Sequence, residues 1–124
     1  MRIKQGRLKT YHHRAAQAKK DDEGNSYTEY GSARSFDGEV WPGGGKIQTE
    51  MYGQRLPYIR NCRIDGKYHE KVSDDGRIGY CLGDMIVREN DGICLNVCGS
   101  VAPDYRVVSI RPYRFLTLEL EQIK

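Results

Sequence analysis

The chain has 124 residues, of which 38% are hydrophobic and 30% charged, and its formal net charge is +3. This length predicts one domain, and an aromatic content of 10% is too high for a disordered chain. No apolar stretch approaches the roughly 20 residues of a membrane-spanning helix, and Met1–Lys4 lacks the apolar segment of a signal peptide. We therefore expect no membrane contact and assembly in the cytosol.

Charge is unevenly distributed along the chain. Residues 1–20 contain basic but no acidic side chains. Among residues 21–40, every charged side chain is acidic except Arg34. This pattern is typical of a solvated strand followed by an acidic loop. It also fits a polarised surface that docks against a charged neighbour or faces nucleic acid.

The first half of the chain contains three short runs that predict strands, at residues 8–16, 27–30 and 36–41. In the first strand, alternation places His12 and His13 on opposite faces, so they cannot act on one ligand. A polar turn is expected at residues 19–25. The third strand must end at Pro42–Gly45, because Pro and three glycines cannot lie inside a regular element.

Residues 42–57 predict a long loop. Ile47 and Met51 stand four apart, as on one face of a helix, but Gly53 and Pro57 argue against a stable helix. We expect a long excursion containing a short helix or an irregular strand. Its glycine-rich start is not a phosphate-binding loop, because the first glycine and the final hydroxyl of that motif are missing.

Asp-Gly pairs favour tight hairpin turns, because both residues tolerate positive φ. The chain has four such pairs: Asp37-Gly38, Asp65-Gly66, Asp75-Gly76 and Asp91-Gly92. The last three are flanked by runs rich in Tyr, Val, Ile and Leu. These runs predict strands at residues 61–64, 67–72, 78–82, 85–88 and 92–97.

The C-terminal part is the most regular. We expect a strand at residues 105–110, a turn at residues 111–114 and a returning strand at residues 115–121. In the returning strand, Leu116, Leu118 and Leu120 share one face and polar residues share the other, as in a half-buried strand. The whole chain, residues 1–124, is thus predicted to be a single mainly β domain. We expect a small antiparallel β-barrel of the SH3 or OB type, with long loops.

The four cysteines are Cys62, Cys81, Cys94 and Cys98. Without a secretion signal we expect no disulfides. In a strand, Cys94 and Cys98 would lie about 13 Å apart, too far to bind one metal. We therefore expect small buried thiols, no metal and no cofactor.

No serine is framed by a nucleophile elbow, and His69-Glu70 has no partner at metal-ligand spacing. We therefore expect a protein that is not an enzyme. An alternative remains, because a barrel with many Tyr and Arg residues could be an OB-like module that binds single-stranded nucleic acid. Tyr is, however, generally abundant in antiparallel strands.

Read in order, several segments resemble the head-tail joining, or head-closure, proteins of tailed bacteriophages. These segments are Asp21-Asp22-Glu23-Gly24-Asn25, Glu39-Val40-Trp41, the glycine-rich loop with Met51-Tyr52-Gly53, and the strand pair Asp104–Ile110 and Leu116–Leu120. The resemblance implies a non-enzymatic subunit of the virion neck, assembled in the host cytoplasm. Such subunits form a homo-oligomeric ring below the portal or adaptor protein, close the DNA-filled head and present a surface to the tail terminator or tail-joining protein.

In some relatives, the loop after the second strand reaches into the channel and retains the packaged double-stranded DNA. In this chain that loop is residues 42–57, and its expected contact residues are Gly43, Gly44, Gly45, Lys46, Ile47, Met51 and Tyr52. The three glycines would act as a hinge, and the exposed apolar side chains, with Leu56, would be covered by packing around a ring. The basic segment of Arg2, Lys4, Arg7 and Lys9 would face an acidic partner or the DNA.

Overall fold

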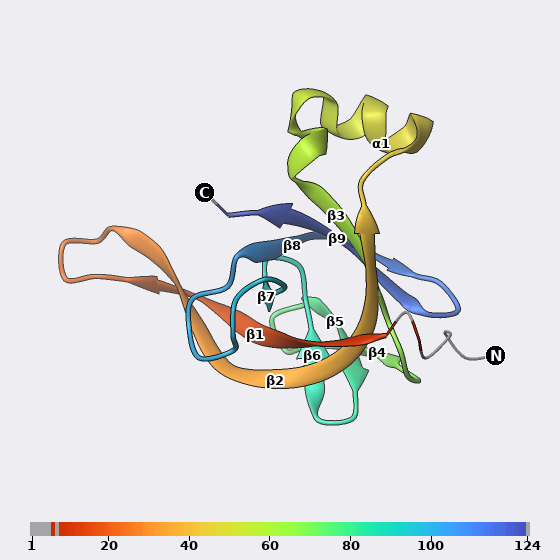
Figure 1. Ribbon diagram of the computed structural model, residues 1–124. Helices are drawn as coiled ribbons and strands as arrows, with labels where there is room; N and C mark the ends of the chain where they lie inside the picture. The colour runs from red at the N-terminus through yellow and green to blue at the C-terminus, as the bar shows by residue number, and fades with distance from the viewer. Residues whose placement is uncertain (1–5, 7, 124) are drawn as a thin grey trace.

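The computed structural model describes residues 6 and 8–123. Figure 1 shows a β-rich body with a helical segment on one side and a long hairpin projecting from another. In chain order the elements are β1 (Lys9–Lys20), β2 (Ser26–Pro42), α1 (Gly45–Tyr52), the 3-10 helix η2 (Gly53–Tyr58), β3 (Ile59–Ile64), β4 (His69–Val72), β5 (Ile78–Leu82), β6 (Met85–Val87), β7 (Gly92–Cys94), β8 (Tyr105–Pro112) and β9 (Leu116–Gln122).

Six strands form a closed antiparallel barrel in the order β1-β2-β3-β9-β8-β7. The barrel is built from two runs of consecutive strands, β1 to β3 and β7 to β9, which meet through the β3–β9 and β1–β7 pairings. The prediction of a small, mainly β antiparallel barrel with long loops and a short helix is confirmed.

The C-terminal strands fill much of the barrel interior. Leu116, Leu118 and Leu120 are fully buried, as their alternation predicted. Each such leucine contributes about 1.5–3 kcal/mol through burial. Tyr80 and Val87 of the second sheet belong to the same core cluster, so that sheet packs against the barrel interior.

The second sheet has three strands in the order β4-β5-β6. Its first hairpin turns at Asp75-Gly76, where Gly76 has φ 83° and the Ser73 amide donates to the Arg77 carbonyl. Its second hairpin turns at Gly83-Asp84, with Gly83 at φ 62°. The hairpin turn that an Asp-Gly pair favours therefore forms at Asp75-Gly76.

The other Asp-Gly pairs do not form hairpins. Asp37-Gly38 lies inside β2, and Asp65-Gly66 links β3 to β4, which belong to different sheets. Gly92 begins β7 and buried Asp91 directly precedes it, while Asn90 takes the positive φ, at 75°. The prediction of a hairpin at Asp91-Gly92 is wrong, because both residues instead contact β1.

Asp91 ties β7 to β1 through a buried polar contact. Oδ2 of Asp91 lies 2.7 Å from Nε2 of His13, and the two side chains are only 2% and 3% exposed. The same carboxylate accepts hydrogen bonds from the backbone amides of Ala16, at 3.0 Å, and Arg88, at 2.9 Å. One carboxylate thus joins β1 to the chain around residues 88–91.

Strands β1 and β2 are longer than predicted. They remain paired from Lys9 with Gly38 out to Lys20 with Ser26, so the expected polar loop is a tight turn at the end of a hairpin. The Asp21 carboxylate closes this turn by accepting from the amides of Glu23 and Asn25. These hydrogen bonds, that of Asn25 most of all, lower the pKa of Asp21.

The cysteine prediction is confirmed for three of the four residues. Cys62, Cys81 and Cys94 are buried, and burial raises the pKa of Cys62 to about 12. Cys98 is exposed, because β7 ends at Cys94 and the chain then leaves the sheet. The expected strand at residues 92–97 is therefore too long.

Candidate assembly surface

The segment that follows β2 is a folded helical unit rather than a flexible loop, and its glycines have different roles. A Cβ atom on Gly43 would lie 3.0 Å from the carbonyl oxygen of Ile59, so no larger residue fits there without a shift. Gly45 has φ 85°, which favours glycine at the start of α1. Gly44 is in open space. We call residues 42–58 the α1 segment.

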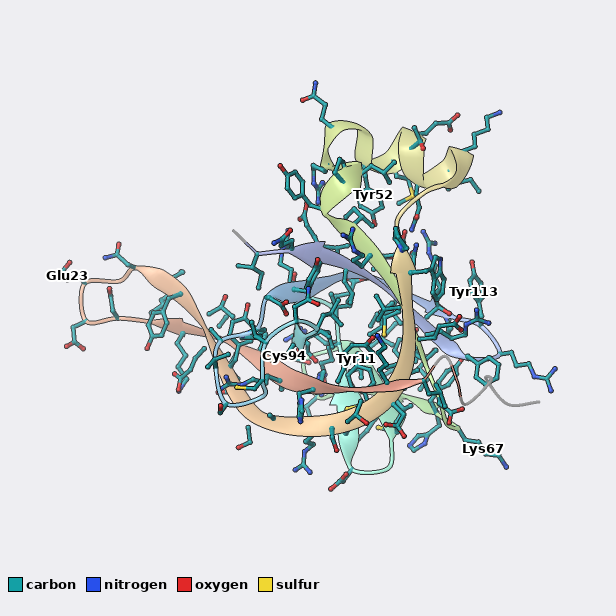
Figure 2. The ribbon with its side chains drawn as sticks, viewed as in Figure 1. Tyr11, Glu23, Tyr52, Lys67, Cys94 and Tyr113 are labelled. Carbon is teal, nitrogen blue, oxygen red and sulfur yellow. The ribbon has the colours of Figure 1, made fainter. Side chains whose placement is uncertain are left out.

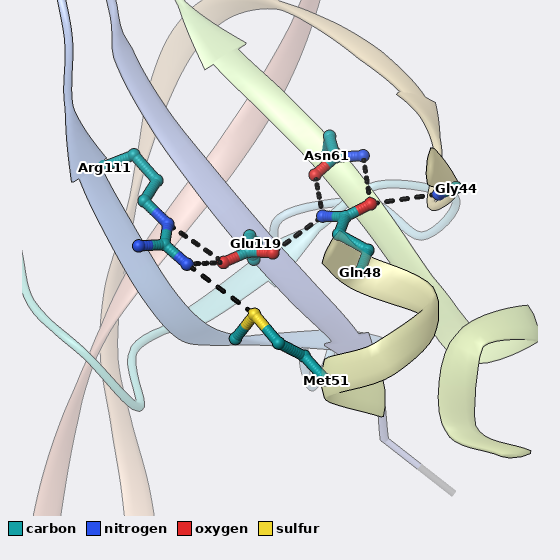
Figure 3. Close-up of polar contacts among 6 residues, drawn as sticks. All are labelled: Gly44, Gln48, Met51, Asn61, Arg111 and Glu119. Atoms are coloured by element: carbon teal, nitrogen blue, oxygen red, sulfur yellow. Dashed lines mark hydrogen bonds and ion pairs between the residues drawn. The ribbon is translucent and has the colours of Figure 1, made fainter. Parts of the chain in front are cut away.

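Gln48 anchors α1 to the barrel, as Figure 3 shows. Its amide nitrogen donates to Oδ1 of Asn61 at 2.6 Å and to Oε2 of Glu119 at 2.7 Å. Its amide oxygen accepts from the Gly44 amide at 2.9 Å and from Nδ2 of Asn61 at 3.2 Å. Gln48 thereby satisfies a helix N-terminal amide and links α1 to β3 and β9.

Glu119 is the buried charge of this network. It is 3% exposed and faces the guanidinium of Arg111, whose Nη2 lies 3.2 Å from Oε1. The same nitrogen lies 3.9 Å from Sδ of Met51. Alternation along β9 predicted Glu119 for the polar face of a half-buried strand. That face is covered here by α1, which the strand pattern could not reveal.

A second contact anchors the end of the α1 segment. Nε of Arg55 donates to Oε2 of Glu121 at 2.6 Å, and Nη2 of Arg106 donates to the other carboxylate oxygen at 2.9 Å. Arg55 also lies over the ring of Tyr52, 5.5 Å from its centroid. Arg55 foremost, with help from Arg106, lowers the pKa of Glu121. Burial raises the pKa of Tyr52, and the Glu119 carboxylate acts in the same direction.

Replacing Glu121 by Gln is expected to remove a small, acid-sensitive part of the stability. Because the folded-state pKa of Glu121 is lowered, its contribution is present above the ordinary Glu pKa and is lost as the pH falls through the folded value. At neutral pH the variant should lose up to about 1 kcal/mol, since Arg55 is half exposed. Urea unfolding of both proteins at several pH values should show this difference shrinking below about pH 4. Glu50→Gln, an exposed change on α1, is the control and should show no such convergence.

The α1 segment presents apolar side chains to solvent beside its anchors. Ile47 is 72% exposed and Met51 is 51% exposed. A hollow of about 480 Å³ lies beside them. It is lined by Trp41, Pro42, Gly44, Ile47, Gln48, Asn61, Arg111, Tyr113, Thr117 and Glu119. This surface is apolar at its rim, with buried polar groups behind it.

The residues of the α1 segment that were expected to contact a partner differ in their exposure to solvent. Lys46 and Ile47 are exposed, and Met51 is half exposed with its Sδ facing Arg111. Tyr52 is buried. Leu56 is half-buried. The apolar surface available to a partner is therefore smaller than the sequence suggested.

Only Lys9 of the predicted basic segment can be placed. It is exposed at the start of β1, where it pairs with Gly38 of β2. Arg2, Lys4 and Arg7 lie outside the described residues. The proposed orientation of this segment toward a partner or DNA stays a prediction.

Within residues 6 and 8–123 there is no group of three or more His, Cys, Asp or Glu side chains suited to hold a metal ion. His13 and Asp91 are close, but both are almost completely buried and would not meet a substrate. This pair is structural.

Sequence reasoning missed Gln48, Asn61, Arg111 and Glu119 as a unit. They come from the α1 segment, β3, β8 and β9. No local pattern links them, although a Gln near a helix start is a known signal for capping. Only the closing of the barrel brings β3 beside β9 and places α1 over both.

No family model, no curated protein and no solved structure matches this chain. In the part of the chain that is described, no helix has the length and apolar character needed to cross a bilayer.

Proposed function

We propose that this chain is a structural subunit of the connector between the head and the tail of a tailed bacteriophage. Copies would form a ring below the portal or adaptor protein, close the DNA-filled head and give the tail terminator or tail-joining protein a docking surface. The chain would act in the virion neck, after assembly in the host cytoplasm, and without catalysis.

One observation supports this proposal most strongly: the α1 segment is firmly held while its apolar side chains remain exposed. Single exposed apolar residues are ordinary on a protein surface. Here the contacts of Gln48 with Asn61 and Glu119 hold α1 on the barrel, while Ile47 and about half of Met51 remain exposed. A partner that covers these side chains would remove their apolar area from water.

The resemblance supplies the identity of that partner. In some head-closure proteins, the loop after the second strand reaches into the channel and retains DNA, and this loop corresponds to the α1 segment. An anchored helix with exposed Ile47 and Met51 suits a protein contact, and exposed Lys46 at its start suits an approach to DNA phosphates. We therefore assign the α1 segment to the inner, partner-facing part of the ring.

The alternative, an OB-like module for single strands, receives less support. Stacking platforms need several accessible rings in one basic groove. The exposed tyrosines Tyr27, Tyr58 and Tyr113 belong to separate elements. Trp41 and Phe115 are both already packed against the guanidinium of Arg63, at 5.2 and 5.9 Å.

Replacing both Ile47 and Met51 by Asp is expected to abolish ring formation on the cognate portal–adaptor complex. Burying two new carboxylates in an apolar contact is strongly unfavourable. Because both residues are exposed, the free energy of unfolding should change by no more than about 0.5 kcal/mol per residue. The measurement is electron-microscopic imaging of the complex after mixing with wild-type or variant protein.

The matched control replaces Val72 and Ile78, an exposed cross-strand apolar pair on the second sheet, by Asp. This control should still form rings. If the wild-type protein itself adds no ring to the cognate complex, the connector proposal is wrong. If the wild-type protein forms rings and the Ile47/Met51 variant does so as well, the α1 segment is not the partner-facing surface.

A further inference from the structure

The outer half of the β1–β2 hairpin is an arm that pairs with no other strand of the described chain, and at its base the Ala16 amide donates to Asp91. Strand β1 pairs with β7 only at His12, His13 and Arg14, and β2 pairs with β3 only from Gly38 onward. Beyond Arg14 the two strands pair with each other alone, and Figure 1 shows them projecting from the barrel. An isolated two-stranded hairpin is only marginally stable in water. We call residues 15–30 the arm.

The base of the arm is nevertheless fixed. The ladder has a bulge between Arg14 and Ala16. There the Arg14 guanidinium donates to the carbonyl oxygens of Gly31, Tyr30 and Val101, at 2.6, 3.2 and 2.8 Å. The arm thus leaves the barrel in a defined direction, as a contact element would.

The tip of the arm carries free negative charge. Asp21 is used internally to close the turn, but Asp22 and Glu23 are exposed and have no cationic partner among the described residues. Lys20 is the nearest basic residue in sequence, and Lys19 is already paired with Glu29 at 3.0 Å. Tyr27, 48% exposed, adds an aromatic surface next to the tip.

The opposite end of the molecule carries the complementary groups. The Tyr68 hydroxyl donates to the Tyr113 carbonyl, so the residue that follows Lys67 contacts the residue that precedes Arg114 in the β8–β9 turn. Lys67 and Arg114 are exposed, and neither forms an ion pair within the described ranges. Tyr113 is 64% exposed beside them. Asp65 is the nearest carboxylate in sequence and is half-buried.

Figure 2 shows Glu23 at one end of the molecule, and Lys67 and Tyr113 at the other. We propose that the arm tip of one copy docks on the Lys67–Arg114 end of the next copy, with Tyr27 and Tyr113 adding aromatic contact. Tip-to-tip pairing would instead place like charges together. A head-to-tail contact of this kind propagates from copy to copy and closes into a ring when the rotation permits. This inference rests on the proposed function and names the subunit–subunit contact of the ring.

Charge reversal at each end tests the contact. One variant carries Asp22→Lys and Glu23→Lys, a second carries Lys67→Glu and Arg114→Glu, and a third carries all four changes. Sedimentation velocity of the concentrated, purified chain at low salt measures self-association. Each two-residue reversal should weaken self-association by about tenfold or more, and the four-residue variant should restore it.

The control adds the same positive charge elsewhere, as Asp74→Lys with Glu89→Lys, two exposed residues of the second-sheet region. It should associate like the wild-type protein, and circular dichroism should show the same fold for every variant. The inference is overturned if the four-residue variant does not regain self-association. It is also overturned if the two-residue reversals associate as strongly as the wild-type chain. The absence of any self-association by the concentrated wild-type chain overturns it as well.

The outcome is separable from that of the portal–adaptor imaging. Rings on the portal–adaptor complex that survive both reversals would refute the arm contact and leave the connector function standing. Conversely, reversal and rescue in the isolated chain, with no ring on that complex, would support the arm contact and refute the connector function.

Discussion

Replacing Asp91 by Ala is expected to lower the free energy of unfolding by about 3–5 kcal/mol. The change removes the acceptor for His13 and for the backbone amides of Ala16 and Arg88; the contact with His13 is buried and the two amide contacts are part-buried. A small domain has only about 5–15 kcal/mol of stability in total, so a large part of it would be lost. Urea denaturation followed by circular dichroism measures the loss.

Two further variants make this prediction specific. Asp84→Ala removes an exposed carboxylate that pairs only with Arg34 at the surface, and it should cost no more than about 1 kcal/mol. Asp91→Asn keeps the shape but replaces one acceptor oxygen with a donor, so its cost should fall between the two. Equal costs for Asp91→Ala and Asp84→Ala would mean that the buried contact does not hold β1 against residues 88–91.

Replacing Gly92 by Ala is expected to destabilise the fold by about 3 kcal/mol. A Cβ atom at this position would lie 2.3 Å from Cγ of Pro103 and 3.0 Å from Cδ1 of Tyr30. The proline ring cannot rotate away, so the backbone of β7 or of residues 101–104 must shift. The midpoint of urea unfolding, together with the slope of the transition, measures the effect.

Gly76→Ala is the matched comparison, because Gly76 also follows an aspartate. At Gly76 the surroundings are open and the strain comes only from φ 83°, so the expected cost is about 1 kcal/mol. If Gly76→Ala were the more damaging substitution, close packing would not be the reason for glycine at position 92.

In the proposed ring, the arm and the α1 segment would make contacts with different partners. The arm tip and the Lys67–Arg114 end lie at opposite ends of the molecule, as a contact repeated around a ring requires. The α1 segment is held apart from both by the Gln48 network. Variants in the arm should therefore affect subunit–subunit contact, and variants of Ile47 and Met51 contact with other connector components.

The sequence alone determined the fold class and the last two strands of the barrel. Alternation of Leu116, Leu118 and Leu120 with polar residues is a local pattern, because neighbouring side chains of a strand point to opposite faces. The same kind of local signal located the Asp75-Gly76 turn and the end of β2 at Pro42. Such features depend on residues a few positions apart, so a linear reading is sufficient for them.

Only the tertiary structure decided the roles of Asp91, Gly92 and Glu119. Asp91 meets His13 across 78 positions of sequence, and Glu119 meets Gln48 across 71. An Asp-Gly pair has the same turn preference wherever it occurs, and a glutamate on a strand has the same alternation whether water or a helix covers it. What distinguishes these cases is which distant segment packs against the residue, and that is set only when the barrel closes and buries the group.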